Sequence, residues 1–540
     1  LGGPRAARHL LMIGNGEGLD RAARWLSQQP NAAAMKVSSW YSEAFAPYFP
    51  GQVSDLRQGV MHVHRVVMYI NQLQRQMPDP NLNAYFAAQR PLYIVRLHRV
   101  DYAIVYPGPV PLPDELAHIS MPLALNFEGQ VRLLGYELVT PQITSGEELV
   151  ITFYWEFLAP LPKDATVYVG LRDPQGNYWG ESNTAPIEGY LPLDESFEEN
   201  PFFRDAHQLT VLSGTPPGRY QIEIGWYSRA LGHEMNVYDA AGNPLGTRAV
   251  IGEVEVKQPA SPPDPEQLEM EERKNIEIGP LRLLGYDRPA GPFRAGEPIP
   301  LTLLWQRRQA GDVSLFLSLR LRQGNQVWQR QQLRPVSETY PPAMWQVGEI
   351  VREQWKALLP VQVTSGRYDL SLLVADPDGK PAVEVPLGPI DVVARAHNFR
   401  PPIPQSPLEI TFGDSVRLLG YDIPRTARPG ETILVTLYWQ ALAEIDTTYK
   451  VFVHFIDEDG QIRAQEDHPP LNGEAPTTGW VPGEVLQDPY QILLPADLPP
   501  GHYSLRVGLY NPVTGQRLPA TAGNAGPDYV DLTPRLRVTP

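Results

Sequence analysis

The chain contains the stretch Val131-Arg132-Leu133-Leu134-Gly135-Tyr136-Glu137. Nearly the same stretch returns at Leu281–Asp287 and again at Val416–Asp422. After each copy come a glycine, a tryptophan nine residues later, and a Gly-x-Tyr that begins a further 61 to 63 residues along. The landmarks are, copy by copy, Gly146, Trp155 and Tyr220; Gly296, Trp305 and Tyr368; Gly430, Trp439 and Tyr503. Their agreement predicts a tandem array of one domain type over the last 420 or so residues.

Each copy is predicted to be all-β. Leu149–Trp155 and Ile433–Trp439 are rich in β-branched and aromatic residues, as strands are. Hairpin signals recur at matching places, at Asp173–Gly176, Arg322–Asn325 and Asp457–Gly460. Seven or eight short strands in roughly 120 to 140 residues are typical of an antiparallel β-sandwich of immunoglobulin-like type.

The repeated aromatic residues are interpreted as structural. The tryptophan of each copy lies in an apolar strand, so we expect it to anchor the core between two sheets. The tyrosine of each Gly-x-Tyr lies after a turn and before a strand, which resembles a tyrosine corner. The predicted core residues are Trp155, Trp305, Trp439, Tyr220, Tyr368 and Tyr503.

Residues 1–108 follow another pattern, in which helices and strands alternate. Apolar residues at helical spacing predict a helix over Gly18–Gln29. The remaining predicted elements are a strand at Met35–Ser39, helices at Glu43–Tyr48 and Leu82–Gln89, a strand at Val66–Ile70, and a closing pair at Tyr93–Leu97 and Tyr102–Tyr106. This order predicts a small α/β domain.

Four domains are therefore expected. They are an α/β domain at 1–108 and β-sandwiches at 119–257, 275–395 and 408–540. Proline-rich linkers at 107–113, 258–273 and 400–407 separate them. Because such linkers favour stiff, extended conformations, we expect a semi-rigid array. Restricted proline-rich loops also predict high thermal stability.

The composition excludes several classes of function. The chain has no cysteine, which rules out disulfides and thiolate metal sites. Its formal net charge of −16 argues against nucleic acid as a partner. It begins at Leu1 instead of Met, which leaves room for a signal peptide or a membrane anchor ahead of it.

Motifs for cofactors and metals are weak. Gly14-Asn15-Gly16-Glu17-Gly18 lacks the glycine spacing of a dinucleotide fingerprint, so no cofactor is expected. His62 and His64 would share one face of a strand, but they lack a third ligand, and we expect no metal site there. Acidic loops at Asp194–Asp205 and Asp457–Asp459 are interpreted as solvated, with calcium binding left open.

Aromatic residues beyond the core strands are the remaining candidates for ligand contact. Exposed rings can stack on sugars, and the candidates for glycan contact are Tyr178, Trp179, Trp328, Trp345 and Trp480. The last two belong to a Trp-x-x-Gly-Glu motif that two copies share, which favours a structural corner over a ligand site. The first copy lacks this motif, so it is the sandwich in which we expect specialisation.

A family resemblance comes from short motifs spread over essentially the whole chain. Gly16–Asp20, Trp40-Tyr41, Tyr69–Gln72 and Asp101–Ala103 resemble the soluble region after the last membrane helices of certain bacterial family 39 glycosyltransferases. Those polytopic enzymes are similar to protein O-mannosyltransferases. The Leu-Leu-Gly-Tyr repeats and Leu437–Gln440 resemble the β-sandwiches that often follow in the same proteins.

The resemblance implies an accessory role. In that family a polyprenyl-phosphate-linked sugar is the donor, and the catalytic acid lies on a loop near the first membrane helices. That region is missing here, so no family catalytic residue is carried onto this sequence. The chain would be the extracytoplasmic tail of such an enzyme, or a descendant released from it, that serves acceptor binding, positioning or assembly.

The leading hypothesis is a non-catalytic array that binds or scaffolds at the cell surface, with other protein subunits or cell-surface glycans as partners. A second is a self-assembling layer, sheath or filament, because repeated surfaces can propagate head-to-tail contacts. A third is a sugar-processing enzyme, for which the sequence singles out no pair of catalytic carboxylates. The oligomeric state stays open.

Overall fold

The computed structural model describes residues 13–139, 141–194, 197, 200–311, 313–329, 334–378, 380–521 and 526–539. The chain divides into two compact units, Leu1–Pro263 and Asp264–Pro540. Within the described residues, no helix is both long and apolar enough to cross a membrane. The molecule is mainly β, as the sequence predicts.

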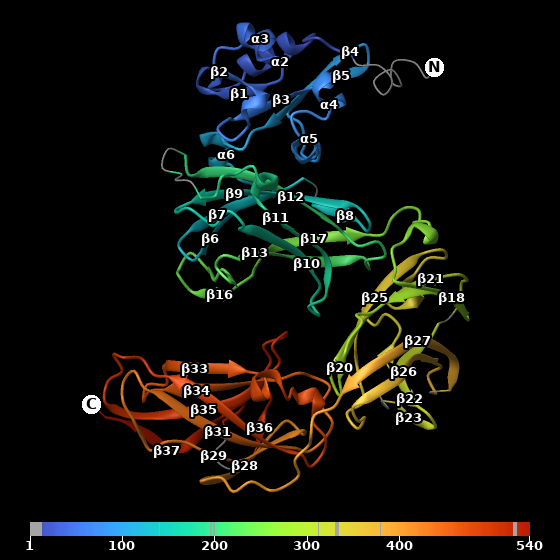
Figure 1. The fold of residues 1–540 in the computed structure, drawn as a ribbon, viewed down its shortest axis with the longest axis vertical. Coiled ribbons are helices and arrows are strands. Elements are labelled where there is room, and N and C mark those ends of the chain that lie inside the picture. The colour runs from blue at the N-terminus through green and yellow to red at the C-terminus, as the bar shows by residue number, and fades with distance from the viewer. Residues whose placement is uncertain are drawn as a thin grey trace. The chain divides into compact units, whose positions relative to one another are not determined.

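The first unit begins with a mixed five-stranded sheet, drawn in blue in Figure 1. Its strands are, in spatial order, β2 (Gln52–Asp55), β1 (Lys36–Ser39), β3 (Arg65–Tyr69), β5 (Val100–Pro107) and β4 (Tyr93–Leu97). Strand β1 pairs parallel with β2 and β3, whereas β5 pairs antiparallel with β3 and β4. The accompanying helices are α2 (Leu19–Ser27), α3 (Ser42–Phe45), α4 (Ile70–Gln74) and α5 (Pro80–Ala87).

One local expectation is wrong. His62 and His64 lie in the turn before β3 and not on a strand, so they do not share a strand face. The Nδ1 of His64 accepts the backbone N–H of Lys36 at 2.9 Å, which gives the ring a structural partner.

The same unit continues as a sandwich of two sheets. The first sheet has the order β12 (Phe202–Thr210), β9 (Glu148–Phe157), β7 (Val131–Leu138), β6 (Met121–Phe127), β15 (Val237–Tyr238) and β16 (Pro244–Gly246). The second has the order β11 (Tyr178–Thr184), β10 (Thr166–Arg172), β13 (Gly218–Ser228), β17 (Ala249–Lys257) and β8 (Gln142–Thr144), with β14 (His233–Glu234) beside β13.

The second unit contains two further sandwiches, drawn in yellow-green and in orange to red in Figure 1. In the second sandwich, one sheet has the order β18 (Glu272–Ile278), β19 (Leu281–Asp287), β21 (Pro298–Arg307) and β25 (Ile350–Leu358). Its other sheet has the order β20 (Phe293–Arg294), β27 (Pro381–Val393), β26 (Gly366–Ala375), β22 (Phe316–Gln323) and β23 (Gln326–Gln329), with β24 (Arg334–Pro335) beside β22. In the third sandwich, one sheet has the order β34 (Val485–Leu493), β31 (Thr432–Ala441), β29 (Val416–Asp422), β28 (Ser406–Phe412) and β36 (Ala520–Thr521). Its other sheet has the order β30 (Thr426–Ala427), β37 (Val530–Val538), β35 (Gly501–Tyr510), β32 (Lys450–Ile456) and β33 (Ile462–His468).

The repeated landmarks occupy equivalent places in the three sandwiches. Trp155, Trp305 and Trp439 are completely buried on β9, β21 and β31. Each stands directly opposite the first leucine of the Leu-Leu-Gly-Tyr stretch in its own copy. The prediction that they anchor the three cores is confirmed.

The tyrosine corners are also present. Tyr220, Tyr368 and Tyr503 are buried, and each hydroxyl donates to the carbonyl oxygen four residues upstream at 2.8 Å. Because the carbonyl belongs to the turn before the strand, this hydrogen bond fixes the turn against the sheet. The repeated Gly-x-Tyr is thus a structural device.

The glycine of the Leu-Leu-Gly-Tyr stretch permits close approach of the preceding chain. A Cβ atom on Gly135 would lie 2.5 Å from the carbonyl oxygen of Met121, and one on Gly420 would lie 2.4 Å from Cγ of Pro404. Such distances are too short for a side chain, so only glycine lets the preceding segment pack on this strand.

The α/β domain and the first sandwich are not separated by a loose linker. One continuous hydrophobic cluster runs through both, from Leu19 to Val256. Helix α6 (Pro113–Ala117) lies between them, and its Glu115 pairs with Arg65 of β3 and Arg204 of β12. The two domains therefore form one packed unit.

Candidate functional site

The aromatic candidates for glycan contact are mostly buried, so the expectation that they are exposed is wrong for three of them. Trp179, Trp345 and Trp480 are at most 5% exposed. Each indole Nε1 donates within its own sandwich: to Asp173 at 2.9 Å, to the carbonyl oxygen of Tyr340 at 2.8 Å and to that of Ala475 at 2.9 Å. These rings fold back over the core and offer no open face for a sugar.

The other two aromatic candidates are half-buried. The hydroxyl of Tyr178 donates to Glu223 at 3.0 Å, and the ring of Trp328 packs edge-on against Tyr368. Glycan contact by these two residues stays a prediction.

The Trp-x-x-Gly-Glu motif closes a turn in both copies that carry it. In the second sandwich, Glu349 accepts the backbone N–H of Gln346 at 2.6 Å and the hydroxyl of Tyr340 at 2.9 Å. In the third, Glu484 accepts the N–H of Val481 at 3.1 Å. The interpretation of the motif as a structural corner fits this geometry.

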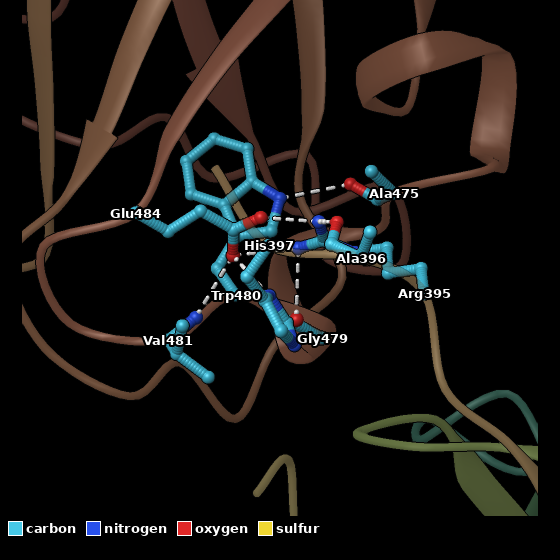
Figure 2. Close-up of polar contacts among 8 residues, drawn as sticks. All are labelled: Arg395, Ala396, His397, Ala475, Gly479, Trp480, Val481 and Glu484. Atoms are coloured by element: carbon cyan, nitrogen blue, oxygen red, sulfur yellow. Dashed lines mark hydrogen bonds and ion pairs between the residues drawn. The ribbon is translucent and has the colours of Figure 1, made fainter. Parts of the chain in front are cut away.

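Glu484 has a further role that Glu349 lacks, because it holds the segment that joins the second and third sandwiches. Figure 2 shows the carboxylate between Arg395 and His397. Arg395 donates to both carboxylate oxygens, with Nη2 to Oε2 at 2.7 Å, and Nδ1 of His397 lies 2.9 Å from Oε2. Glu484 itself is 1% exposed, so water competes little for these contacts. We call Arg395, His397 and Glu484 the linker clasp.

Backbone contacts extend the linker clasp. Nη2 of Arg395 also donates to the carbonyl oxygen of Gly479 at 3.0 Å (Figure 2), and the N–H of Val485 donates to that of Asn398 at 2.7 Å. The segment after β27 is therefore bound to the third sandwich over several residues before the proline-rich stretch begins.

The second and third sandwiches also touch each other directly. A Cβ atom on Gly296 would lie 2.5 Å from Cα of Gly479, so the turn of one domain abuts the turn of the other. Nε2 of Gln362 donates to Oε1 of Glu444 at 2.5 Å across the same junction. The two sandwiches are therefore joined by direct contact and by the linker clasp, and we expect these contacts to limit bending at this joint.

A buried carboxylate stands at one equivalent position in all three sandwiches, and the sequence interpretation missed it. Asp205, Glu353 and Asp488 each lie two residues beyond the partner of the core tryptophan. Each accepts a backbone N–H from a residue with positive φ in a short turn: Ile187 at 2.8 Å, Ser337 at 2.9 Å and Leu471 at 2.8 Å. In the two later copies the carboxylate also accepts the indole N–H of Trp305 or Trp439.

Burial is the main influence on the pKa of the carboxyl groups in the second and third copies. It raises the pKa of Glu353, against the opposing effect of Arg334, and it raises the pKa of Asp488, against hydrogen bonds from Tyr490 and Leu471. Both groups hold a strained turn on the core, so their role is structural.

In the first copy the equivalent carboxylate belongs to a different network. Oδ2 of Asp205 lies 2.6 Å from Nε2 of His207, whose Nδ1 lies 2.9 Å from Oγ1 of Thr184. Hydroxyl, imidazole and carboxylate stand in the order of a hydrolase triad. However, Asp205 and His207 are almost completely buried, and Asp205 has the same turn-holding contact as its counterparts. We assign this network to the fold.

The acidic loops give no metal site within the described residues, where no cluster of three or more metal-binding side chains occurs. The first loop is shorter than expected, because β12 begins at Phe202 and Asp205 points into the sandwich. Glu195, Glu198 and Glu199 lie outside the described residues. In the second loop, Asp457 caps its own hairpin and pairs with Arg463 at 2.7 Å.

Comparisons with known proteins give little. No family model matches the chain, and no curated protein matches it. Among solved structures, a match to red sea bream transglutaminase has 10% sequence identity and covers 49% of this chain and 32% of that chain. Its TM-score of 0.15 carries no argument about function.

Proposed function

We propose that this chain is a non-catalytic, extracytoplasmic array that binds and positions partners at the cell surface. The observation that carries the proposal is the joint between the second and third sandwiches. Glu484 holds Arg395 and His397 of the linker, and the two domains touch at Gly296 and Gly479. A chain whose domains are held together by such contacts suits the presentation of surfaces at fixed spacing better than the opening and closing of a cleft.

Its partners in this proposal are other protein subunits or cell-surface glycans. The short motifs of the sequence resemble the soluble tail of a polyprenyl-phosphate-sugar-dependent membrane glycosyltransferase of the family 39 type, and this resemblance supports a setting beside such an enzyme. In that setting the array would hold the acceptor, or neighbouring proteins, near the membrane face where the sugar is transferred.

A self-assembling surface structure is the second candidate, and one feature of the third sandwich favours it. Leu434 on β31 and Leu493 on the edge strand β34 are 54% and 67% exposed, and Ile403 of the preceding linker is 96% exposed. Exposed apolar residues beside an unpaired strand edge are typical of surfaces that meet another chain.

The two candidates differ in what is isolated from cells. Electron microscopy of the native surface and membrane fractions, with intact-mass analysis of the same sample, separates them. Single particles in detergent with a mass far above 60.4 kDa would support a membrane-enzyme tail. Ordered sheets or filaments of a chain near 60.4 kDa would support the assembly candidate and overturn the enzyme-tail proposal.

A further inference from the structure

A cavity of the first unit lies where the α/β domain meets the first sandwich. Its volume is 680 Å³, within the range of about 300–1,000 Å³ that small-molecule sites occupy. Seven lining residues matter for its chemistry: Arg90, Asp114, Glu115, His118, Glu137, Tyr154 and Arg204. Among them, Nδ1 of His118 lies 3.3 Å from Oδ1 of Asp114.

The fold brings these side chains together from two domains. Strands β7, β9 and β12 are neighbours in one sheet, and they supply Glu137, Tyr154 and Arg204. Arg204 stands directly opposite Tyr154 in the strand pair, with its guanidinium 6.0 Å from the ring centre. Helix α6, on the other side, supplies Asp114 and Glu115.

Buried ion pairs hold the cavity's inner wall. Nη1 of Arg204 lies 3.4 Å from Oε1 of Glu115, and its Nη2 donates to the carbonyl oxygen of Gly108 at 2.8 Å. The same Oε1 lies 3.1 Å from Arg65. Arg204 is only 6% exposed, so its orientation is fixed. A guanidinium carries five N–H donors, and these contacts use only part of them.

The charges of the wall are balanced. Arg90 and Arg204 face Asp114, Glu115 and Glu137 in the lining, and Arg65 behind Glu115 brings the count to three of each sign. An anionic ligand would meet three carboxylates, and a cationic one would meet the guanidiniums. An apolar ligand would offer no partner to the donors and acceptors that these ion pairs do not use, which is unfavourable. A neutral ligand with many hydroxyls fits, because each hydroxyl both donates and accepts.

We infer that this cavity binds a neutral saccharide, with Arg204 as donor, Glu137 and Asp114 as acceptors, and Tyr154 as part of the wall. Neither of the other sandwiches combines a tyrosine and an arginine at these positions. The third keeps the tyrosine as Tyr438, but Gln487 stands where the first sandwich has Arg204. The counterpart of Tyr154 in the second copy is Leu304, which is buried in a cluster closed by Leu268. The inference rests on the proposed function for its choice of glycans as partners, but it concerns a different part of the molecule from the linker clasp.

The inference is tested by titrating the full chain with four neutral trisaccharides: maltotriose, cellotriose, mannotriose and chitotriose. Calorimetry and saturation-transfer NMR detect the binding. At least one is expected to bind with a Kd of about 1 mM or tighter. Glu137→Gln keeps the shape of the side chain and removes its charge, and is expected to weaken that binding about tenfold. Glu148→Gln, an exposed position on the same strand as Tyr154, is the matched control and should bind as the unaltered chain does.

Asp114→Asn provides a second variant on the other wall, in case Glu137→Gln does not fold. Absence of binding by all four trisaccharides, binding of glucuronate in preference to them, or binding that neither variant weakens would overturn the inference. None of these results would affect the joint between the second and third sandwiches. Failure here and failure of the array proposal are therefore distinguishable.

Discussion

Arg395 donates to both carboxylate oxygens of Glu484, although 89 residues separate the two in sequence. Arg395 follows β27, the last strand of the second sandwich, and Glu484 directly precedes β34 of the third sandwich. Because Glu484 is 1% exposed and its motif also closes a turn, the contact couples the linker to the folding of the third sandwich. Glu349 carries the same motif and closes a similar turn in the second sandwich, which makes it a natural control.

Removal of one tyrosine-corner hydroxyl is expected to destabilise only its own sandwich. Tyr503→Phe deletes the 2.8 Å hydrogen bond to the carbonyl oxygen of Pro499 and should lower the free energy of unfolding of the third sandwich by about 1 kcal/mol. Urea unfolding followed by tryptophan fluorescence measures the change. Tyr449→Phe, in the same sandwich but outside the corner, should shift the transition less, and equal shifts would contradict the role given to the corner.

Truncation of a buried motif tryptophan should be far more costly. Trp480 is completely buried and donates to the carbonyl oxygen of Ala475, so Trp480→Ala is expected to cost about 3–5 kcal/mol. The same urea experiment gives the value. A loss below about 1 kcal/mol would mean that the ring is a surface feature and not part of the core.

The buried carboxyl of Asp488 predicts a pH dependence with a definite sign. Its folded-state pKa is raised, chiefly by burial, above the unfolded value of about 3.9. The stability that it contributes is fully present below about pH 3.9 and is lost as the pH rises through the folded-state pKa. The advantage of the unaltered chain over Asp488→Asn should therefore shrink as the pH increases from about 4.

Asp457 in the same sandwich provides a control of opposite sign. Hydrogen bonds, first from the N–H of Gln461, lower its pKa, so its contribution is present above the unfolded value and lost as the pH falls. For each variant, the difference in urea midpoint from the unaltered chain is measured over a pH series. The plots of this difference against pH for Asp488→Asn and Asp457→Asn should have slopes of opposite sign. Parallel slopes would contradict the assignment of burial as the dominant cause at Asp488.

High thermal stability remains a prediction from the proline-rich loops. The chain has 58 prolines, which restrict the unfolded state. We expect thermal unfolding, followed by circular dichroism, to begin above the usual mesophile range of about 45–65 °C. Onset near 50 °C would show that the prolines do not have this effect.

Repetition explains what could be predicted from the sequence. Three copies in register mark the core tryptophans and the corner tyrosines, because residues that recur at fixed spacing serve the part of the fold that recurs. The alternating elements of residues 13–108 were likewise predicted, since helical and strand periodicities are local properties.

The errors arise from side-chain direction, which local patterns do not give. Trp179 follows a hairpin and reads as exposed, yet its indole turns back to Asp173 of the same hairpin. The sequence places Asp205 in an acidic loop, yet it lies in the buried part of strand β12. A signal for the buried carboxylates did exist: Glu353 and Asp488 each lie four residues after the glutamate of the shared motif.

The linker clasp had no such signal. Arg395 lies in the linker and Glu484 in the third sandwich, and the sequence around each residue does not indicate its partner. The same holds for the cavity beside Arg204, whose wall comes from β7, β9, β12 and α6. Contacts between domains depend on how folded surfaces meet, and one sequence does not record that.

The measurement that tests the array proposal most directly is the distribution of distances between spin labels on the second and third sandwiches. The chain has no native cysteine, so labels at Gln326→Cys and Gln491→Cys, both exposed positions, report on this joint alone. A semi-rigid array predicts one narrow distribution, which broadens in Glu484→Gln and stays narrow in the control Glu349→Gln. A broad distribution in the unaltered chain, or no difference between the two variants, would contradict the claim that the linker clasp fixes the joint.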